Sequence, residues 1–399
     1  MNIAQKSPRF WLTLLVALAY LLLMAGCTSG EETAVAPAEQ TAAQVEESHD
    51  DDHDHEEEHT EEHDDHEHEE EHKDDHAHDE AHDHDDEAEI LLLPTLEAVD
   101  LGGQRLRVVA TTSIIGDVLA QVGGEAIDLT TLMSAGQDPH SYEPGARDLT
   151  AVSAAHIIFV NGWNLEEALL DNLATIGENV PLVPISANIA PLTFGGHAHE
   201  GDEAHADEAH ADEAHDHDHG NADPHTWFSI HNVEQWVKNA QQVLSDLDPA
   251  NADIFASNAA AYLEELEELE QYASEQLATI PAERRFLVTN HDSFGFFARD
   301  YGFEVLGTVI PGRSTLAEPS ARDLAGLIET MREHNVCTIF TEATVSDKLA
   351  QTAAAELAGC DQVQVLKLFT GAIGPAGSGA DSYVGMFRAN VDSIVAGLR

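Results

Sequence analysis

The chain has 399 residues, and its 75 Asp and Glu against 17 Lys and Arg give a formal net charge of −58. This excess argues against a nucleic acid as a partner, because nucleic acids are themselves polyanions. The histidines are uneven too: of 25, 12 lie between His49 and His84, 7 between His197 and His219, and 6 elsewhere. The remaining sequence has ordinary apolar content and is long enough for two packed lobes.

Residues 1–26 have the pattern of a lipoprotein signal peptide. Lys6 and Arg9 precede an apolar run that ends in small residues directly before Cys27. The run is short for a membrane-spanning helix, and a signal peptidase requires small residues at its cleavage site. We therefore expect lipid on Cys27 and a location outside the cytoplasm, in a periplasm or on a cell surface. Met24 stands where leucine is usual in such a site, so an uncleaved N-terminal anchor is the alternative.

Residues 27–104 are predicted to form a lipid-anchored, disordered tail rich in His, Asp and Glu. Between Glu46 and Glu89 the chain has 26 acidic side chains and one lysine, so it cannot bury enough apolar surface to offset chain entropy. The pattern H-E-x-x-H occurs at 55–59 and 68–72. A zinc protease needs that motif on a packed helix, whereas a tract of this composition produces it by chance.

From residue 105 onward, short β-branched runs alternate with helical patterns, which predicts an α/β fold with mainly parallel sheets. We expect a first βα lobe at 105–248, with a His-rich loop at 195–221, and a second lobe at 282–399. A linker helix at 249–281 would join them, with Asp248 as its N-cap and Pro249 at its first position. It would be about 45 Å long from Asn251 to Ile280, which is more than one lobe needs and indicates a rigid connector.

If Cys27 carries lipid, Cys337 and Cys360 are the remaining cysteines. Each stands just before an apparent strand, at 338–341 and 362–368, and an oxidising compartment allows them to pair. Two buried thiols fit the sequence equally well, because the distance between the cysteines cannot be read from it.

Three histidines outside the tracts lie in turns suited to binding. His140 and His225 follow the same dipeptide, in Asp138-Pro139-His140 and Asp223-Pro224-His225. The proline restricts the backbone of the residue before it and holds the imidazole at a loop tip. His291 stands between a predicted strand and a predicted helix, at the edge where open α/β sheets bind ligands. Each alone would more often be a surface or core residue. Together, from both lobes, they predict a metal site.

These motifs resemble those of the metal-binding solute-binding proteins of bacterial ABC importers, the cluster A-I group that serves zinc and manganese. The similarity runs from about Arg107 to Arg399 and is interrupted by the second His tract. It is carried by Asp138-Pro139-His140-Ser141-Tyr142-Glu143-Pro144, Asn161-Gly162 with Leu165-Glu166, Asp223-Pro224-His225-Thr226-Trp227, Asp248-Pro249-Ala250-Asn251, Asn290-His291-Asp292-Ser293-Phe294-Gly295-Phe296-Phe297, Glu318-Pro319-Ser320 and Asp381-Ser382-Tyr383. The chain departs from the family at His156, where Asp is common, and in its long N-terminal His tract. The resemblance implies two βα lobes bridged by one long helix, with a metal in the cleft between them.

Carried over residue by residue, the family's ligands fall on His140 and His225 in the first lobe and on His291 and Asp381 in the second. Water or Glu143 are alternatives for the fourth position, and Asp381 can instead cap the last helix. Zinc-type members resemble this chain in having His at the third position and a His-rich acidic loop before the second. Three imidazoles with at most one carboxylate also favour Zn²⁺ over Mn²⁺, although copper or nickel can bind such donors in vitro.

We therefore expect a monomeric receptor that captures Zn²⁺ and hands it to the membrane permease of an ABC importer, which works with its ATPase. Competing hypotheses are a manganese or broad divalent-metal receptor, an adhesin of the same fold, and a zinc hydrolase with Glu143 or Asp292 as its base. Both His tracts are expected to bind metal weakly, or else to act as solvated acidic spacers. The histidines of the second tract are His197, His199, His205, His210, His215, His217 and His219.

Overall fold

A computed structural model describes residues 89–399 apart from 177–179, 194–221, 313, 358 and 361. The expected signal peptide, Cys27 and both His tracts lie outside the described residues. The described residues fall within one compact unit, Glu80–Arg399. None of their helices combines the length and apolar character needed to cross a membrane.

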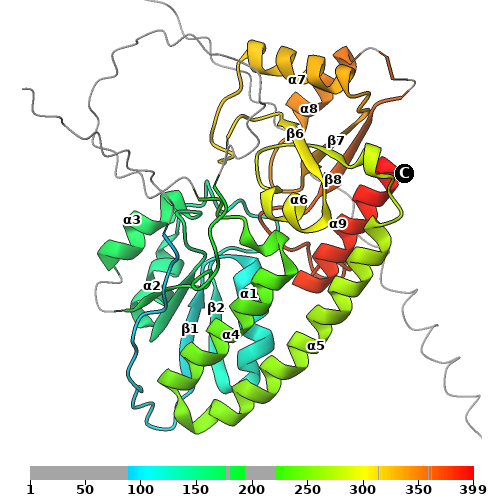
Figure 1. The fold of residues 1–399 in the computed structure, drawn as a ribbon. Helices are drawn as coiled ribbons and strands as arrows, with labels where there is room; N and C mark the ends of the chain where they lie inside the picture. Colours follow the sequence, from blue (N-terminus) through cyan, green and yellow to red (C-terminus); the bar gives the residue numbers. More distant parts are fainter. Residues whose placement is uncertain (1–88, 177–179, 194–221, 313, 358, 361) are drawn as a thin grey trace, which may run out of the picture. The chain divides into compact units, whose positions relative to one another are not determined.

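The first lobe is built on a four-stranded sheet with the order β2-β1-β3-β4 (Figure 1). Its strands are β1 (Leu106–Ala110), β2 (Ile127–Thr131), β3 (Ile157–Val160) and β4 (Leu182–Pro184). All three pairings are parallel, as expected when helices connect successive strands. The helices of this lobe are α1 (Ser113–Gly123), α2 (Ala146–Ala154), α3 (Glu167–Ile176) and α4 (Ile230–Leu247), with short 3₁₀ turns η1 (Gly124–Ala126) and η2 (Thr226–Phe228). The central strands β1 and β3 are almost fully buried, which explains their continuous apolar sequences.

The second lobe contains two parallel strand pairs, β5–β6 and β7–β8, and β5 contacts β7. Its strands are β5 (Phe286–Thr289), β6 (Glu304–Thr308), β7 (Thr338–Glu342) and β8 (Gln364–Leu368). Its helices are α6 (Gly295–Tyr301), α7 (Ala321–Glu333), α8 (Lys348–Glu356) and α9 (Tyr383–Leu398), with a 3₁₀ turn η4 (Ala282–Arg284). Helix α7 begins with a capping box: the Ser320 hydroxyl accepts from the Asp323 N–H, and the Asp323 carboxylate accepts from the Ser320 N–H.

The long helix α5 (Ala252–Leu277) packs against α1 and α4 of the first lobe and against α9 of the second (Figure 1). Its buried residues lie on one stripe: Phe255, Ala259, Tyr262, Leu266, Leu269, Ala273 and Leu277. The α/β fold with mainly parallel sheets and one long helix is thus confirmed. The helix is shorter at both ends than the predicted 249–281: Pro249–Asn251 form a separate 3₁₀ turn, η3, and the helix ends at Leu277. The exact lobe boundaries remain predictions.

The packed part of the chain begins earlier than residue 105. Residues 89–104, which we assigned to the tail, are described, and Leu91, Leu93 and Val99 are partly buried against the main core. The Leu91 carbonyl accepts from Asn188 N at 2.7 Å, and Val99 N donates to the Leu247 carbonyl at 2.9 Å. These leucines supply apolar surface that the acidic tract lacks, and its burial offsets the entropy of ordering this segment.

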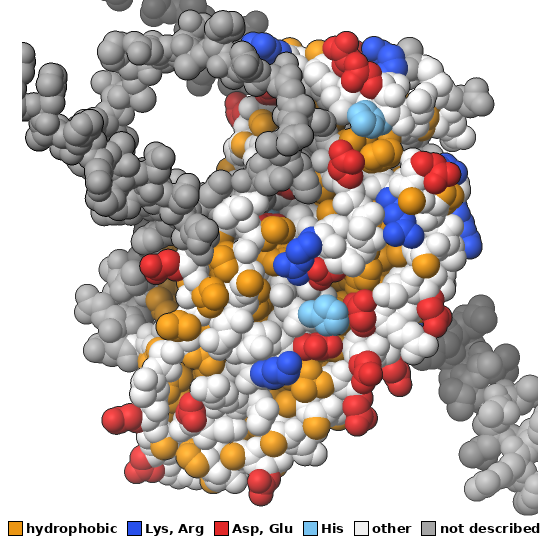
Figure 2. Space-filling view, in the orientation of Figure 1, with side chains coloured by type: hydrophobic (Ala, Val, Ile, Leu, Met, Phe, Trp, Pro, Cys, Tyr) orange, Lys and Arg blue, Asp and Glu red, His pale blue; other side chains and the backbone are white. Residues whose placement is uncertain are grey.

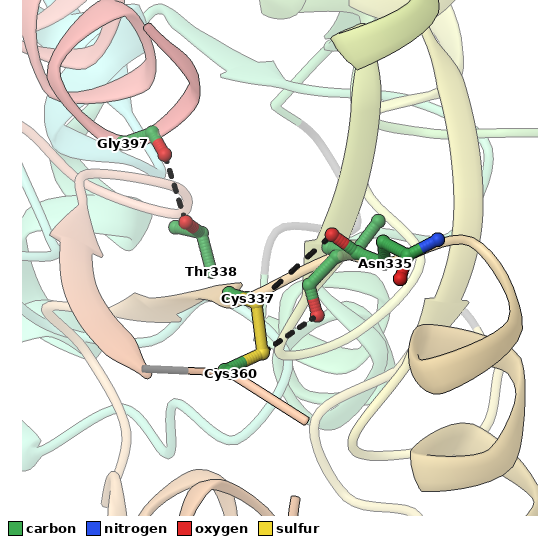
Figure 3. The surroundings of a disulfide bond; sticks show 6 residues. Asn335, Cys337, Thr338, Cys360 and Gly397 are labelled. Atoms are coloured by element: carbon green, nitrogen blue, oxygen red, sulfur yellow. Dashed lines mark hydrogen bonds between the residues drawn. A yellow bond between two sulfur atoms is a disulfide. The ribbon is translucent and has the colours of Figure 1, made fainter. Parts of the chain in front are cut away.

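Cys337 and Cys360 are joined by a disulfide, with 5.8 Å between their Cα atoms (Figure 3). Cys337 directly precedes β7, and Cys360 lies shortly before β8. Beside the bond, the Thr338 hydroxyl donates to the Gly397 carbonyl of α9 at 2.8 Å. The disulfide therefore connects the amino-terminal ends of two neighbouring parallel strands.

Candidate metal centre

Three histidine side chains, two from the first lobe and one from the second, meet at their Nε2 atoms. His225 Nε2 lies 3.3 Å from His140 Nε2 and 3.0 Å from His291 Nε2. Of the His, Cys, Asp and Glu side chains in the described part of the chain, these three have ligand atoms that all lie within 4.8 Å of one another. The structure therefore brings together three of the four predicted ligands.

The spacing of these nitrogens suits a small tetrahedral ion. Zn–N bonds of about 2.0–2.1 Å at tetrahedral angles place nitrogen ligands about 3.3–3.4 Å apart. The pair His140 and His225 is at this separation, and the pair His225 and His291 is slightly closer. Small movements of the side chains would therefore accommodate a metal ion.

The second histidine, His225, is oriented by its own turn. Both its backbone N–H and its Nδ1 approach Asp223 Oδ1, at 2.9 and 2.8 Å. A carboxylate accepts from Nδ1–H, which makes Nε2 the nitrogen of this ring that can bind a metal. Burial raises the pKa of Asp223 to about 7, although the His225 N–H opposes that rise. The turn is also held from the first sheet, because Asn161 Nδ2 donates to the Pro224 carbonyl at 2.7 Å.

The third histidine, His291, is paired with a buried carboxylate that sequence reasoning missed. Its Nδ1 donates to Glu342 Oε1, and Glu342 Oε2 accepts from the Thr370 hydroxyl at 2.6 Å and the Thr344 hydroxyl at 3.3 Å. Burial opposes ionisation of both partners. The attraction between them outweighs burial, so the pKa of His291 is raised and that of Glu342 is lowered. The pair holds the His291 ring with Nε2 toward the other two imidazoles.

The turn of the first histidine, His140, is held by a hydrogen bond to its backbone. Its N–H donates to Asp138 Oδ1 at 3.1 Å, and its Nδ1 lies 3.9 Å from Glu167 Oε1. Asp138 Oδ2 accepts from the Thr315 hydroxyl of the second lobe at 2.6 Å. A side chain from the opposite lobe therefore contacts the turn that carries His140.

The structure does not bring the predicted fourth ligand to this group. Asp381 is exposed, and its Oδ2 accepts from the Gly377 N–H at 2.7 Å, a bond that lowers the pKa of the carboxyl. Glu143, the alternative, is exposed as well and does not belong to the group. Ser382 is the residue that caps α9, by accepting from Gly385 N. The role of Asp381 as a ligand remains a prediction.

The position of Glu342 in the sequence contains a signal that could have identified it as a residue of the site. It is the last residue of a buried, β-branched strand, and the carboxyl ends of parallel strands are where open α/β sheets place their ligands. His291 follows β5 in the same way. A search for carboxylates at strand ends would have found Glu342, although not its pairing with His291.

The three histidines are shielded from the charged surface of the lobes. Their side chains are almost completely buried, with exposures of 2% for His140, 1% for His225 and 2% for His291. On the face shown in Figure 2, Lys and Arg side chains lie among Asp and Glu side chains. A bound metal would therefore be selected by the buried donors and their spacing rather than by surface charge.

Comparisons with known proteins agree with this geometry. Residues 108–397 match the family model of ZnuA, described as zinc-uptake complex component A, periplasmic. The manganese-binding lipoprotein MntA of Halalkalibacterium halodurans is 32% identical over 296 residues, which cover 74% of this chain and 89% of that protein. The manganese ABC transporter substrate-binding lipoprotein PsaA of Streptococcus pneumoniae is 31% identical over 303 residues, covering 74% and 90%.

A solved structure extends the similarity to the fold. The periplasmic zinc binding protein TroA from Treponema pallidum has a TM-score of 0.64 and 30% sequence identity, and the match covers 74% of this chain and 99% of that one. The proteins of this family bind a metal and serve ABC importers, in which a membrane permease and an ATPase carry out transport. The chain therefore belongs to the ZnuA family of metal-binding, substrate-binding proteins of ABC importers, and it is a receptor and not an enzyme.

Proposed function

We propose that the metal captured by this receptor is Zn²⁺ and that the three buried imidazoles are its ligands. The observation that supports zinc is the donor set that the described residues form: three histidine nitrogens within 4.8 Å of one another, a group that includes no carboxylate of the described part of the chain. Zn²⁺ accepts nitrogen ligands at low coordination number, whereas Mn²⁺ favours more oxygen ligands.

Manganese is the second candidate, because relatives at 31–32% identity are named for manganese. Further oxygen donors would be needed to make the histidine site favourable for that ion. The choice between the metals therefore depends on whether carboxylates join the site when it is filled.

We propose Asp381 as the fourth ligand. Its carboxylate now accepts the Gly377 N–H, so ligation requires the turn at 377–381 to release that bond. Glu143 or a water molecule are the alternatives for this position. Substitution distinguishes these candidates, because replacing Asp381 or Glu143 removes a carboxylate ligand, whereas a water ligand is not removed by either substitution.

We also propose that Cys27 carries the lipid that anchors the chain outside the cytoplasm, where the receptor works as a monomer. Two observations support this proposal: MntA and PsaA are named lipoproteins, and the family is described as periplasmic. The His tracts would then gather metal weakly near the membrane. Their capture should fade below about pH 6.5, because protonated imidazole does not bind metal.

A competition titration of the mature chain against a chelator of known affinity tests the metal assignment, with Zn²⁺ and Mn²⁺ in parallel. A strong chelator keeps the weak tract sites empty. We expect one tight zinc equivalent, weaker manganese binding, and loss of the tight site in His291→Ala. His231→Ala, which removes an exposed histidine from α4, should leave it intact. Tighter binding of manganese than of zinc would refute the proposal.

A further inference from the structure

The dipeptide Thr370-Gly371, just after β8, touches the surroundings of all three candidate ligands. It belongs to the second lobe, yet two of its three contacts are with first-lobe turns. Thr370 is buried, with 2% of its surface exposed. Such a position allows one short segment to control how the three imidazoles are spaced.

The first contact concerns His291. The Thr370 hydroxyl donates to Glu342 Oε2 at 2.6 Å, and the other oxygen of Glu342 accepts from His291 Nδ1. The hydroxyl therefore fixes the rotation of the carboxylate that orients the ligand.

The second contact concerns His225. The Thr370 carbonyl accepts from Trp227 Nε1 at 2.8 Å, across the two lobes. Trp227 follows His225 by two residues, and the two rings meet edge to face with 5.3 Å between their centroids. The indole is 1% exposed, so this hydrogen bond is made in a dry environment where its loss is costly.

The third contact concerns His140. A Cβ atom on Gly371 would lie only 2.6 Å from Pro139 Cδ and 3.2 Å from Pro139 Cγ. The proline ring is rigid, so the clash could be relieved only by moving the turn or the lobe. Glycine at 371 thus permits the second lobe to approach the residue directly before His140.

We propose that Thr370-Gly371 is a positioning element that sets the approach of the two lobes at the metal site and, with it, the spacing of His140, His225 and His291. This inference rests on the proposed function, because it takes the three imidazoles as the ligands. Short Zn–N bonds require close nitrogens, so widening the site should weaken zinc binding more than manganese binding.

The hydroxyl is tested by Thr370→Val, which keeps the shape and the carbonyl of the residue. We expect zinc affinity to fall about 10-fold, as for other groups that orient metal-binding histidines, and Thr370→Ser to restore most of it. Thr338→Val is the matched control, because Thr338 is also buried and its hydroxyl also makes one hydrogen bond, to Gly397 near the disulfide (Figure 3). That variant should keep wild-type zinc affinity. The visible absorption spectrum of bound Co²⁺ reports coordination geometry. This spectrum should change in Thr370→Val and stay as in the wild type in Thr338→Val.

The close approach is tested by Gly371→Ala. We expect a lower ratio of zinc to manganese affinity than in the wild type. Gly326→Ala is the control, because a Cβ there meets no atom within 4 Å. The double variant Pro139→Ala/Gly371→Ala removes the clashing ring atoms, so its zinc loss should be smaller than the sum of the two single losses.

The inference is overturned if Thr370→Val binds zinc like Thr338→Val, or if Gly371→Ala keeps the metal ratio of Gly326→Ala. Failure of the proposed function looks different. It would show in the wild-type chain itself, as tighter binding of manganese than of zinc or as tight zinc binding that survives His291→Ala.

Discussion

Glu342→Gln is expected to weaken zinc binding while leaving the fold intact. The glutamine oxygen can still accept from His291 Nδ1, but the negative charge behind the imidazole is lost. A hydrogen bond to a charged group contributes about 1.5–3 kcal/mol and a neutral one about 0.5–1.5 kcal/mol, so the exchange of one for the other costs about 1–1.5 kcal/mol. At about 1.4 kcal/mol for each factor of ten, this corresponds to an affinity loss of about 5- to 10-fold. Mutation of the orienting partner of a metal-bound histidine typically costs about 10- to 100-fold, and the glutamine variant should lie at the lower end because it keeps an acceptor for Nδ1–H.

The assay is a chelator competition at pH 8, where protons compete least with the metal for His291. Glu333→Gln, an exposed change at the end of α7, serves as the control. If Glu342 acts through His291, then adding Glu342→Gln to His291→Ala should cost little further affinity. Wild-type zinc affinity in folded Glu342→Gln, or full additivity with His291→Ala, would refute the reasoning.

Three other predictions follow from the described contacts. Burial disfavours the protonated form of His291, but the attraction of Glu342 outweighs burial and raises the pKa of His291. Zinc affinity should therefore decline as the pH falls, and the decline should begin at a higher pH than in Glu342→Gln. Zinc titrations from pH 8 to 5.5 check this prediction, and coincident pH profiles of the two proteins would contradict it. Replacing Cys337 and Cys360 by serine opens a loop with a sequence separation of 23 residues. This should lower the free energy of unfolding in denaturant by about 3 kcal/mol, and unchanged stability would count against it. Asp381→Asn should reduce zinc affinity at least about 10-fold if the carboxylate is the fourth ligand; an unchanged affinity would exclude it from that role.

The disulfide and the metal centre occupy opposite ends of the same strands. Cys337 and Cys360 stand before β7 and β8, whereas Glu342 ends β7 and Thr370 follows β8. Strands of five residues separate the two regions by about 16 Å at 3.3 Å per residue. Loss of the disulfide should therefore affect stability more than zinc binding.

The helix α5 restricts how the lobes can move. It packs on α1 and α4 in one lobe and on α9 in the other, and its buried stripe is continuous from Phe255 to Leu277. A rigid helix hinges poorly compared with flexible strands, so metal binding is expected to involve modest movement of one lobe. Local contacts such as those of Thr370-Gly371 would then have more influence on the site than a large closure.

Local sequence patterns determined most of the secondary structure. Alternation of β-branched runs and amphipathic stretches depends on neighbours a few residues apart, which is why the parallel strands and the start of α7 at Ser320 were predictable. Boundaries were less accurate. The linker helix begins after Pro249–Asn251, and Leu91, Leu93 and Val99 pack against the core ahead of the predicted boundary at residue 105, because tertiary burial decides where ordering is favourable.

The sequence by itself also determined which histidines were candidate ligands, because His140, His225 and His291 lie in proline-restricted turns or at a strand end. Only the tertiary structure decided that their Nε2 atoms converge, that Glu342 lies behind His291, and that Asp381 stays apart with Gly377. The physical reason is distance along the chain. Thr370 and Trp227 are 143 residues apart, and no local pattern encodes a contact that exists only once both lobes have packed.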